Sequence, residues 1–291
     1  MLGRAVCACH TRQAGSSQLR HTASPRSPAV STTQATSGAL HGTNRVVHAH
    51  DYNLLLCETN GLREREDAFF SMLKQKIVDG ILAIDPGVSV DNLREYGAKY
   101  PIVQCCEHKE GIDLPYVGVD DEKGAYSAVS HLIATGCRRI AMANASGSFG
   151  FARLRRAGYL RALQEHGIEF DPDLLLQYEF GVDSGADIAA RLLALSEPID
   201  GVFLDYDVIA VDAQRALIDT GVKVPEDIAI VGFDGSDMTL ICTPRLTTIA
   251  QPAYQIGMKA AEMLFAVLEG EALKERNVTL DFELKVRQST R

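Results

Sequence analysis

From Tyr52 onward the chain alternates short apolar runs with amphipathic stretches, and this alternation restricts its fold more than any other feature. The runs at 52–58, 80–85 and 101–106 have the length and composition of buried strands. Between them, residues 63–77 place their apolar side chains on one helical face. Strands that alternate with helices form βαβ units, so we predict an α/β fold with mostly parallel sheets.

The same rhythm continues to the C-terminus. Strands are predicted at 116–119, 139–144, 174–180, 201–205, 228–233 and 280–287, and helices at 123–135, 154–166, 186–195, 208–220 and 253–268. The strands of this series end in polar residues. Open α/β sheets bind ligands at the carboxyl ends of their strands, so these ends are where a site is expected.

The first 36 residues have a different composition, rich in Ser, Thr, Ala, Gln and Arg, without helical or strand periodicity. Such a segment buries too little apolar surface to offset the entropy of ordering, and we predict that residues 1–36 are disordered. An organellar transit peptide and a non-native start of translation remain alternatives. A secretion signal is disfavoured because the segment lacks an apolar stretch of the required length.

Charge is distributed unevenly over the 291 residues, whose net charge is −9. The first 50 residues hold five of the 29 basic residues and none of the 38 acidic ones. The acidic remainder would repel phosphate backbones, so it is a poor nucleic-acid surface. No apolar run approaches the roughly 18 residues that span a bilayer. We therefore expect a cytoplasmic protein with no membrane partner, and its odd number of cysteines in apolar contexts favours reduced thiols.

The common catalytic and cofactor signatures are missing from the sequence, and we expect neither enzymatic activity nor a cofactor. Cys7, Cys9 and His10 lie close together, but no second pair follows at zinc-site spacing, so no metal site is predicted. The segment Gly147–Gly150 could hold an anion on its backbone N–H groups, although a plain turn is the better interpretation.

Five residues stand just past predicted strand ends and could form a binding site. They are Arg155, Phe180, Tyr206, Asp207 and Asp234. Arginine and aspartate can bond vicinal hydroxyls in pairs, and an aromatic face packs against a sugar or base ring. Singly, each is better explained by a surface ion pair or by packing, and only their shared location favours a site.

Several runs of the sequence resemble the LacI/GalR family of bacterial transcription regulators. They include KIVDGILAIDP, ARLRRAGYLRAL and, most specifically, VPEDIAIVGFD followed by PRLTTIAQP. Within the family the chain is most similar to cytidine- and purine-repressor types. The resemblance implies two Rossmann-like lobes of the periplasmic-binding-protein type I, with a small sugar or nucleoside effector bound between them.

The resemblance also implies boundaries and site residues. Crossovers between lobes would fall near Gly118, Gln251 and Thr279, which assigns 37–118 with 252–279 to the N-terminal lobe and 119–251 with 280–291 to the C-terminal lobe. By position in the family's motifs, the implied effector contacts are Arg155, Phe180, Tyr206, Asp234 and Cys106, the last at a position where the family often has Asp.

The chain departs from the family in two respects. Neither the helix-turn-helix nor the hinge helix is recognisable, so operator DNA would be bound only through a segment not visible here. The first strand of the first lobe is also missing. The implied mechanism is effector-driven closure of the lobes in a homodimer, with dimer contacts from the helix 253–268 or, alternatively, burial of that helix in the core. A transporter's solute-binding protein and a truncated, non-DNA-binding gene fragment are the competing interpretations.

Overall fold

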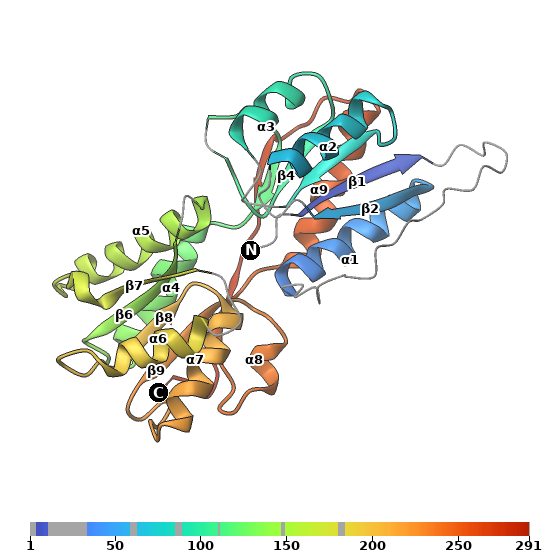
Figure 1. Ribbon diagram of the computed structural model, residues 1–291. Coiled ribbons are helices and arrows are strands. Elements are labelled where there is room, and N and C mark those ends of the chain that lie inside the picture. The colour runs from blue at the N-terminus through green and yellow to red at the C-terminus, as the bar shows by residue number, and fades with distance from the viewer. Residues whose placement is uncertain are drawn as a thin grey trace.

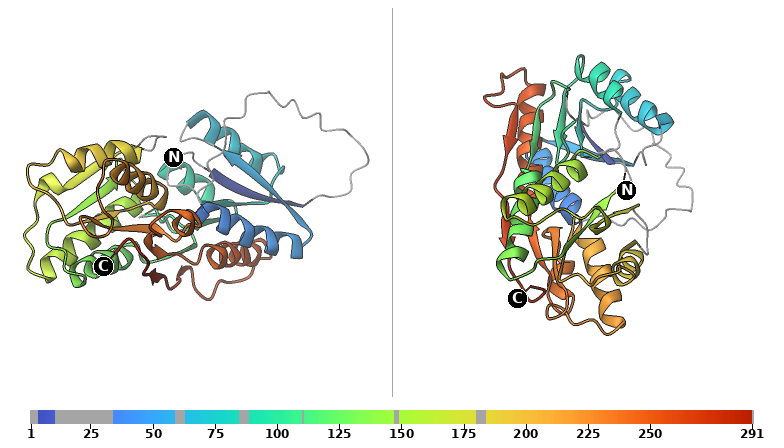
Figure 2. Two further views of the ribbon diagram at one scale, coloured as in Figure 1. Left: turned by 90° about the horizontal axis from the view of Figure 1, so that it is seen from below. Right: turned by 90° about the vertical axis from the view of Figure 1, so that its left-hand side faces the viewer.

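The computed structural model describes residues 4–10, 34–58, 63–84, 89–109, 111–146, 149–179 and 184–290. These residues form two α/β lobes, each built on a six-stranded sheet (Figure 1, Figure 2). Strand order is β11-β5-β4-β3-β1-β2 in lobe 1 and β12-β10-β9-β8-β6-β7 in lobe 2. The predicted α/β architecture with two Rossmann-like lobes is confirmed.

Lobe 1 combines the first part of the chain with a late helix and strand. Its elements are β1 (Arg4–His10), α1 (Gln34–Ala49), β2 (Tyr52–Glu58), α2 (Arg63–Lys74), β3 (Gly80–Ala83), α3 (Val90–Gly97), β4 (Ile102–Cys105), β5 (Tyr116–Gly118), α9 (Ala253–Leu268) and β11 (Asn277–Thr279). The apolar side of α9 packs on α1 and on the sheet, where Ile256, Ala260 and Leu264 are buried. Most of the apolar surface of α9 is therefore buried in the core of lobe 1. This is the alternative that the sequence left open beside a dimer contact.

Lobe 2 holds the middle of the chain. Its elements are α4 (Asp121–Ala134), β6 (Ile140–Ala145), α5 (Gly150–Glu165), a 3₁₀ turn (Pro172–Leu174), β7 (Leu175–Tyr178), α6 (Ser184–Leu193), β8 (Gly201–Leu204), α7 (Asp207–Asp219), β9 (Ala229–Asp234), α8 (Met238–Ile241), β10 (Thr247–Ala250) and β12 (Glu283–Lys285). Apolar residues cover both faces of the sheet, as expected for central parallel strands.

The chain passes between the lobes three times: after β5, between β10 and α9, and between β11 and β12. The predicted strand 280–287 is shorter than expected, because only Glu283–Lys285 pairs with β10, while Asn277–Thr279 pairs with β5 in the other lobe. These three connections place the carboxyl ends of the parallel strands of both sheets around one inter-lobe region.

The prediction that residues 1–36 are disordered is wrong for Arg4–His10, which form the strand β1, and for residues 34–36, which begin the helix α1. This strand runs antiparallel to both neighbours, from Arg4 opposite Glu58 to His10 opposite Tyr52 on β2, and from Ala5 opposite Ala83 on β3. It lies between β3 and β2 in the sheet of lobe 1. Composition could not reveal this strand, since β2 and β3 are distant in sequence and their edges offer its backbone hydrogen-bond partners.

Two glycines bring α1 and α9 into direct backbone contact. A Cβ on Gly257 would lie 1.9 Å from the carbonyl oxygen of Ala39, and a Cβ on Gly42 would lie 2.0 Å from that of Tyr254. Only glycine fits at such distances. The close approach places the first turn of α9, which follows the second lobe connection, against the start of α1.

Candidate ligand-binding site

The guanidinium of Arg155 is at the centre of a buried polar cluster beside the lobe connections. Its Nε donates to Asp121 Oδ1 at 2.8 Å, Nη1 donates to the carbonyl oxygen of Asp205, and Nη2 lies 3.6 Å from Asp234 Oδ1. The group also stacks on the Phe233 ring, 3.5 Å from its centroid. Burial opposes the charge, but Asp121, Asp234 and Asp205 together hold the pKa of Arg155 above its ordinary value.

Asp234 is the last residue of β9 and adopts a φ of 119°, which is unusual for a residue other than glycine. Its Oδ1 accepts a 2.8 Å hydrogen bond from Gln251 Nε2, in the connection between β10 and α9. Burial raises the pKa of Asp234 to about 8, since it outweighs the attraction of Arg155, and the charge of Asp207 adds to the effect. The left-handed backbone thus aims a weakly acidic carboxyl at a lobe connection.

Asp207 holds the segment that follows Asp234. Its Oδ2 accepts from the Ser236 backbone N–H at 2.6 Å, and its Oδ1 accepts from the Thr248 hydroxyl at 2.7 Å. Burial raises its pKa to about 7 against these hydrogen bonds. Although the sequence suggested Asp207 as a ligand contact, its oxygens are engaged in fixing the β9–α8 turn.

Asp205 fixes the carboxyl end of β8 in the same way. Its carboxylate accepts from the Tyr178 hydroxyl, from Asn144 Nδ2 at 2.9 Å and from the Ala145 backbone N–H at 2.8 Å. The side chain of Tyr206 is buried in the apolar core of lobe 2 beneath this end of the sheet. The carboxyl ends of β6, β7 and β8 are therefore joined by hydrogen bonds within the protein itself.

Lobe 1 contributes Cys106 and Glu107, which follow β4. Cys106 adopts a φ of 68°, and its Sγ lies 3.8 Å from that of Cys105. This hydrogen bond, burial and the charges of Asp234 and Asp121 raise the pKa of the Cys106 thiol. Glu107 reaches across to lobe 2, where its Oε1 accepts from the Gly150 N–H at 2.8 Å and its Oε2 from the Phe151 N–H at 3.3 Å.

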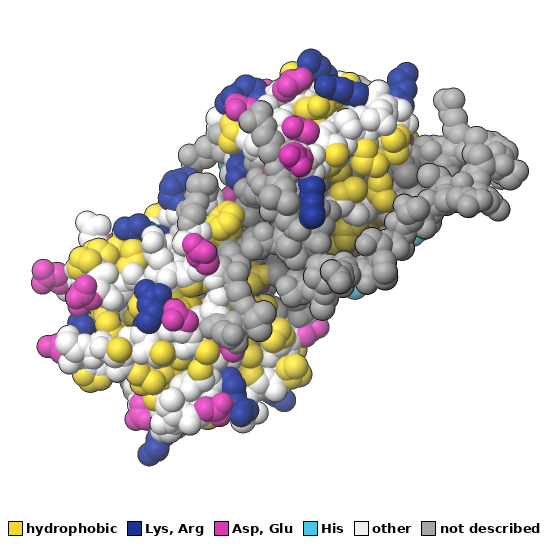
Figure 3. Space-filling view, viewed as in Figure 1, with side chains coloured by type: hydrophobic (Ala, Val, Ile, Leu, Met, Phe, Trp, Pro, Cys, Tyr) yellow, Lys and Arg dark blue, Asp and Glu magenta, His cyan; other side chains and the backbone are white. Residues whose placement is uncertain are grey.

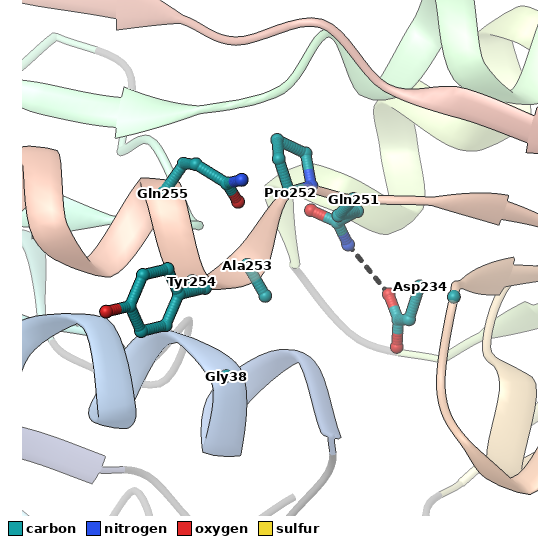
Figure 4. A pocket seen from close by; sticks show the side chains of 8 residues that line it. Gly38, Asp234, Gln251, Pro252, Ala253, Tyr254 and Gln255 are labelled. Atoms are coloured by element: carbon teal, nitrogen blue, oxygen red, sulfur yellow. Dashed lines mark hydrogen bonds between the residues drawn. The ribbon is translucent and has the colours of Figure 1, made fainter.

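A pocket of about 240 Å³, here called the hinge pocket, opens beside this cluster. It is lined by Gly38, Asp234, Gly235, Gln251, Pro252, Ala253, Tyr254 and Gln255. In Figure 4, Asp234 and Gln251 point toward one another, while Gly38 faces the start of α9 from α1. The pocket thus joins lobe 1, lobe 2 and a lobe connection.

The residues that the sequence predicted as effector contacts do not all lie in one place. The structure brings Arg155, Asp234 and Cys106 into one cluster and places Tyr206 in a core, whereas Phe180 lies outside the described residues. Sequence reasoning missed Asp121, Glu107 and Gln251. The run VGVDD before α4 was an available signal for Asp121, because two acidic residues at a helix start and directly after a lobe connection exceed what a cap needs.

The described residues offer neither a membrane-spanning helix nor a cluster of metal ligands. No helix there is long and apolar enough to cross a membrane. No three His, Cys, Asp or Glu side chains in the described ranges come together as metal ligands; the side chains of Cys7, Cys9 and His10 lie outside the description.

Comparisons with known proteins agree with this architecture. A family model described as a periplasmic binding protein-like domain matches residues 129–290. The HTH-type transcriptional repressor CytR of Escherichia coli K12 is 32% identical over 256 residues, covering 88% of this chain and 75% of its own length. The regulator RegA of Clostridium saccharobutylicum is 33% identical, covering 86% and 76%.

Solved structures give the same result. The transcription regulator CcpA of Lactococcus lactis superposes with a TM-score of 0.83 at 27% identity, covering 89% of this chain and 95% of its own. A LacI family regulator from Enterococcus faecium, solved with bound ribose, gives 0.77 at 27% identity, covering 88% and 94%.

The fold and the inter-lobe cluster define a periplasmic-binding-protein-like, two-lobed effector domain. With these relatives, the chain belongs to the LacI/GalR family of transcriptional regulators.

Proposed function

We propose that this chain is the effector sensor of a cytoplasmic regulator and performs no chemistry of its own. A small sugar or nucleoside-like ligand would bind in the hinge pocket against Asp234, with Arg155 behind it. The carboxylates of Asp205 and Asp207 support a binding role over a catalytic one, because their oxygens already accept hydrogen bonds that fix the strand ends around the site. Operator contact would come from a helix-turn-helix of the kind for which CytR is named, outside the recognisable part of this chain.

The observation that carries this proposal is the position of Asp234. Its carboxyl lines the hinge pocket, accepts from Gln251 in a lobe connection and neighbours Arg155 of lobe 2. A ligand hydroxyl that bonds Asp234 would compete with Gln251 and so act on the connection itself. Because Gly38 of lobe 1 lines the same pocket, the ligand would favour one relative orientation of the lobes.

A homodimer would carry this change to DNA. The exposed apolar residues of α8 support a contact between two copies: Met238, Leu240 and Ile241 are 39%, 45% and 82% exposed, beside a groove lined by Val211. Since α8 follows Asp234 by only a few residues, an isologous contact there would sense the state of the site.

The charge on one face of the molecule fits a sensor better than a DNA-binding surface. On the side shown in Figure 3, basic and acidic side chains alternate over both lobes without a continuous basic area. Such a surface gives little electrostatic attraction to a phosphate backbone.

The test is a thermal unfolding scan of the chain, alone and with millimolar pentoses, hexoses, nucleosides and purines. One ligand class should raise the midpoint, because a ligand that binds only the folded state stabilises it. Asp234→Ala should abolish that rise, measured against the variant's own midpoint without ligand. A cooperative transition that no class shifts, or an Asp234→Ala variant that responds like the parent, would reject the proposed site.

A further inference from the structure

The proposed site is unusually acidic. Five carboxylates lie in or directly behind the inter-lobe cluster: Glu107, Asp121, Asp205, Asp207 and Asp234. Of the residues that the structure describes, Arg155 is the only buried Arg or Lys. Its guanidinium is already shared among Asp121, Asp234 and the Asp205 carbonyl. An incoming anion would therefore find its natural counter-ion already occupied.

The start of α5 is the other place in this region where an anion could be held. Backbone N–H groups in the first turn of a helix lack partners within the helix and favour negative groups. Here the N–H groups of Gly150 and Phe151 donate to the two oxygens of Glu107, which is only 6% exposed. A protein carboxylate from lobe 1 thus takes the position in lobe 2 that a phosphate would use.

The fit around Glu107 is tight. A Cβ on Gly150 would lie 2.7 Å from Glu107 Oε1 and 3.3 Å from the His108 carbonyl oxygen, so the loop after β4 touches the helix start directly. Lys109 lies in the same loop, and its positive charge favours the ionised form of Glu107. The Glu107 carboxylate therefore already offsets the charge of Lys109. A ligand phosphate would have to displace this contact and separate the lobes locally.

We infer that the effector is an unphosphorylated hydroxylated molecule, and that Glu107 excludes sugar phosphates and nucleotides by closing the α5 N-terminus from the opposite lobe. This inference rests on the proposed function and narrows it. A phosphate monoester brings roughly two negative charges at neutral pH. Neither Arg155, which is paired with Asp121, nor the start of α5, which is capped by Glu107, is free to balance them. The unphosphorylated molecule brings no charge that has to be balanced.

Matched ligand pairs test the inference: ribose with ribose 5-phosphate, glucose with glucose 6-phosphate, and cytidine with cytidine 5′-monophosphate. Affinities are measured by calorimetry for the parent, Glu107→Gln and Glu197→Gln. Glu107→Gln keeps an oxygen acceptor for the Gly150 N–H but removes the charge, and the exposed Glu197 provides the same substitution away from the site.

In the pair that binds, the unphosphorylated member should bind the parent at least about tenfold more tightly. Glu107→Gln should narrow this ratio several-fold, and Glu197→Gln should leave it unchanged. Equal or tighter binding of the phosphorylated member to the parent overturns the inference while leaving the sensor function intact. An unchanged ratio in Glu107→Gln overturns the assignment to Glu107, and the parent ratio decides the ligand class even if that variant fails to fold. If no member of any pair binds, the proposed function itself fails.

Discussion

Gly158 on α5 lies so close to Glu122 on α4 that a Cβ at Gly158 would be 2.2 Å from the Glu122 carbonyl oxygen. This contact sets the separation of the two helices. Asp121 precedes Glu122 on α4, and Arg155 lies one turn before Gly158 on α5, so the same approach brings the buried ion pair together. The geometry of the candidate site is thus fixed by a backbone contact outside it.

Gly158→Ala is expected to destabilise lobe 2, since the new methyl group meets backbone atoms that cannot move independently. We expect a loss of about 1–3 kcal/mol in the free energy of unfolding, measured by urea denaturation. Arg156→Ala, at an exposed position of the same helix, should change it by less than about 0.5 kcal/mol. Equal stability of Gly158→Ala and the parent would show that the helices can separate freely.

Removing Arg155 should lower the free energy of unfolding, because the surrounding carboxylates would stay buried without their positive partner. Arg155→Met leaves Asp121 buried without its 2.8 Å partner, and losing one member of a buried pair typically costs about 3–5 kcal/mol. Adding Asp121→Asn should recover part of that loss, because the orphaned charge is then gone. A double-mutant cycle by chemical denaturation measures the coupling; strictly additive losses would mean that the pair does not interact energetically.

The raised pKa of Asp234 predicts how stability depends on pH. In the folded protein this pKa is about 8, against an ordinary value of 3.8, so the folded state binds more protons between these values. Its contribution to stability is complete below about pH 4 and is lost as the pH rises through about 8. The parent should therefore lose stability between pH 5 and pH 9 more steeply than Asp234→Asn. Parallel pH profiles of the two proteins would contradict this prediction.

The strand β1 is expected to protect its neighbours. Deleting residues 1–10 removes the partner of both β2 and β3 and leaves two open edges in the sheet of lobe 1. Amide hydrogen exchange in β2 and β3 should then accelerate by at least about tenfold, with β6 and β8 of lobe 2 as the internal reference. Unchanged exchange in β2 and β3 would show that the pairing does not persist in solution.

The sequence was sufficient to predict features that depend on local periodicity. The helix 253–268 has the predicted bounds, and the strand–helix alternation correctly indicated two parallel-rich sheets. The proximity of Arg155 and Asp234 could be predicted because both follow or end strands on the same side of a sheet, where topology brings them together. These inferences required only patterns within single elements.

The features that the sequence did not reveal depend on contacts between distant segments. Glu107 has no local signature, because its role comes from helix N–H groups 43 residues away. β1 was missed because its partners are two strands elsewhere in the chain, and α5 begins at Gly150, earlier than the predicted 154, because Glu107 supplies acceptors for its first turn. Periodicity does not record such pairings.

The direction of β1 also determines where anything attached ahead of it would emerge. A parallel strand in this position would begin at the edge of the sheet remote from lobe 2. β1 instead begins with Arg4 and Ala5 beside Ala83, at the carboxyl end of β3, and runs away from the hinge (Figure 1). A domain or affinity tag joined before Arg4 would therefore be delivered to the mouth of the inter-lobe region, next to the candidate site.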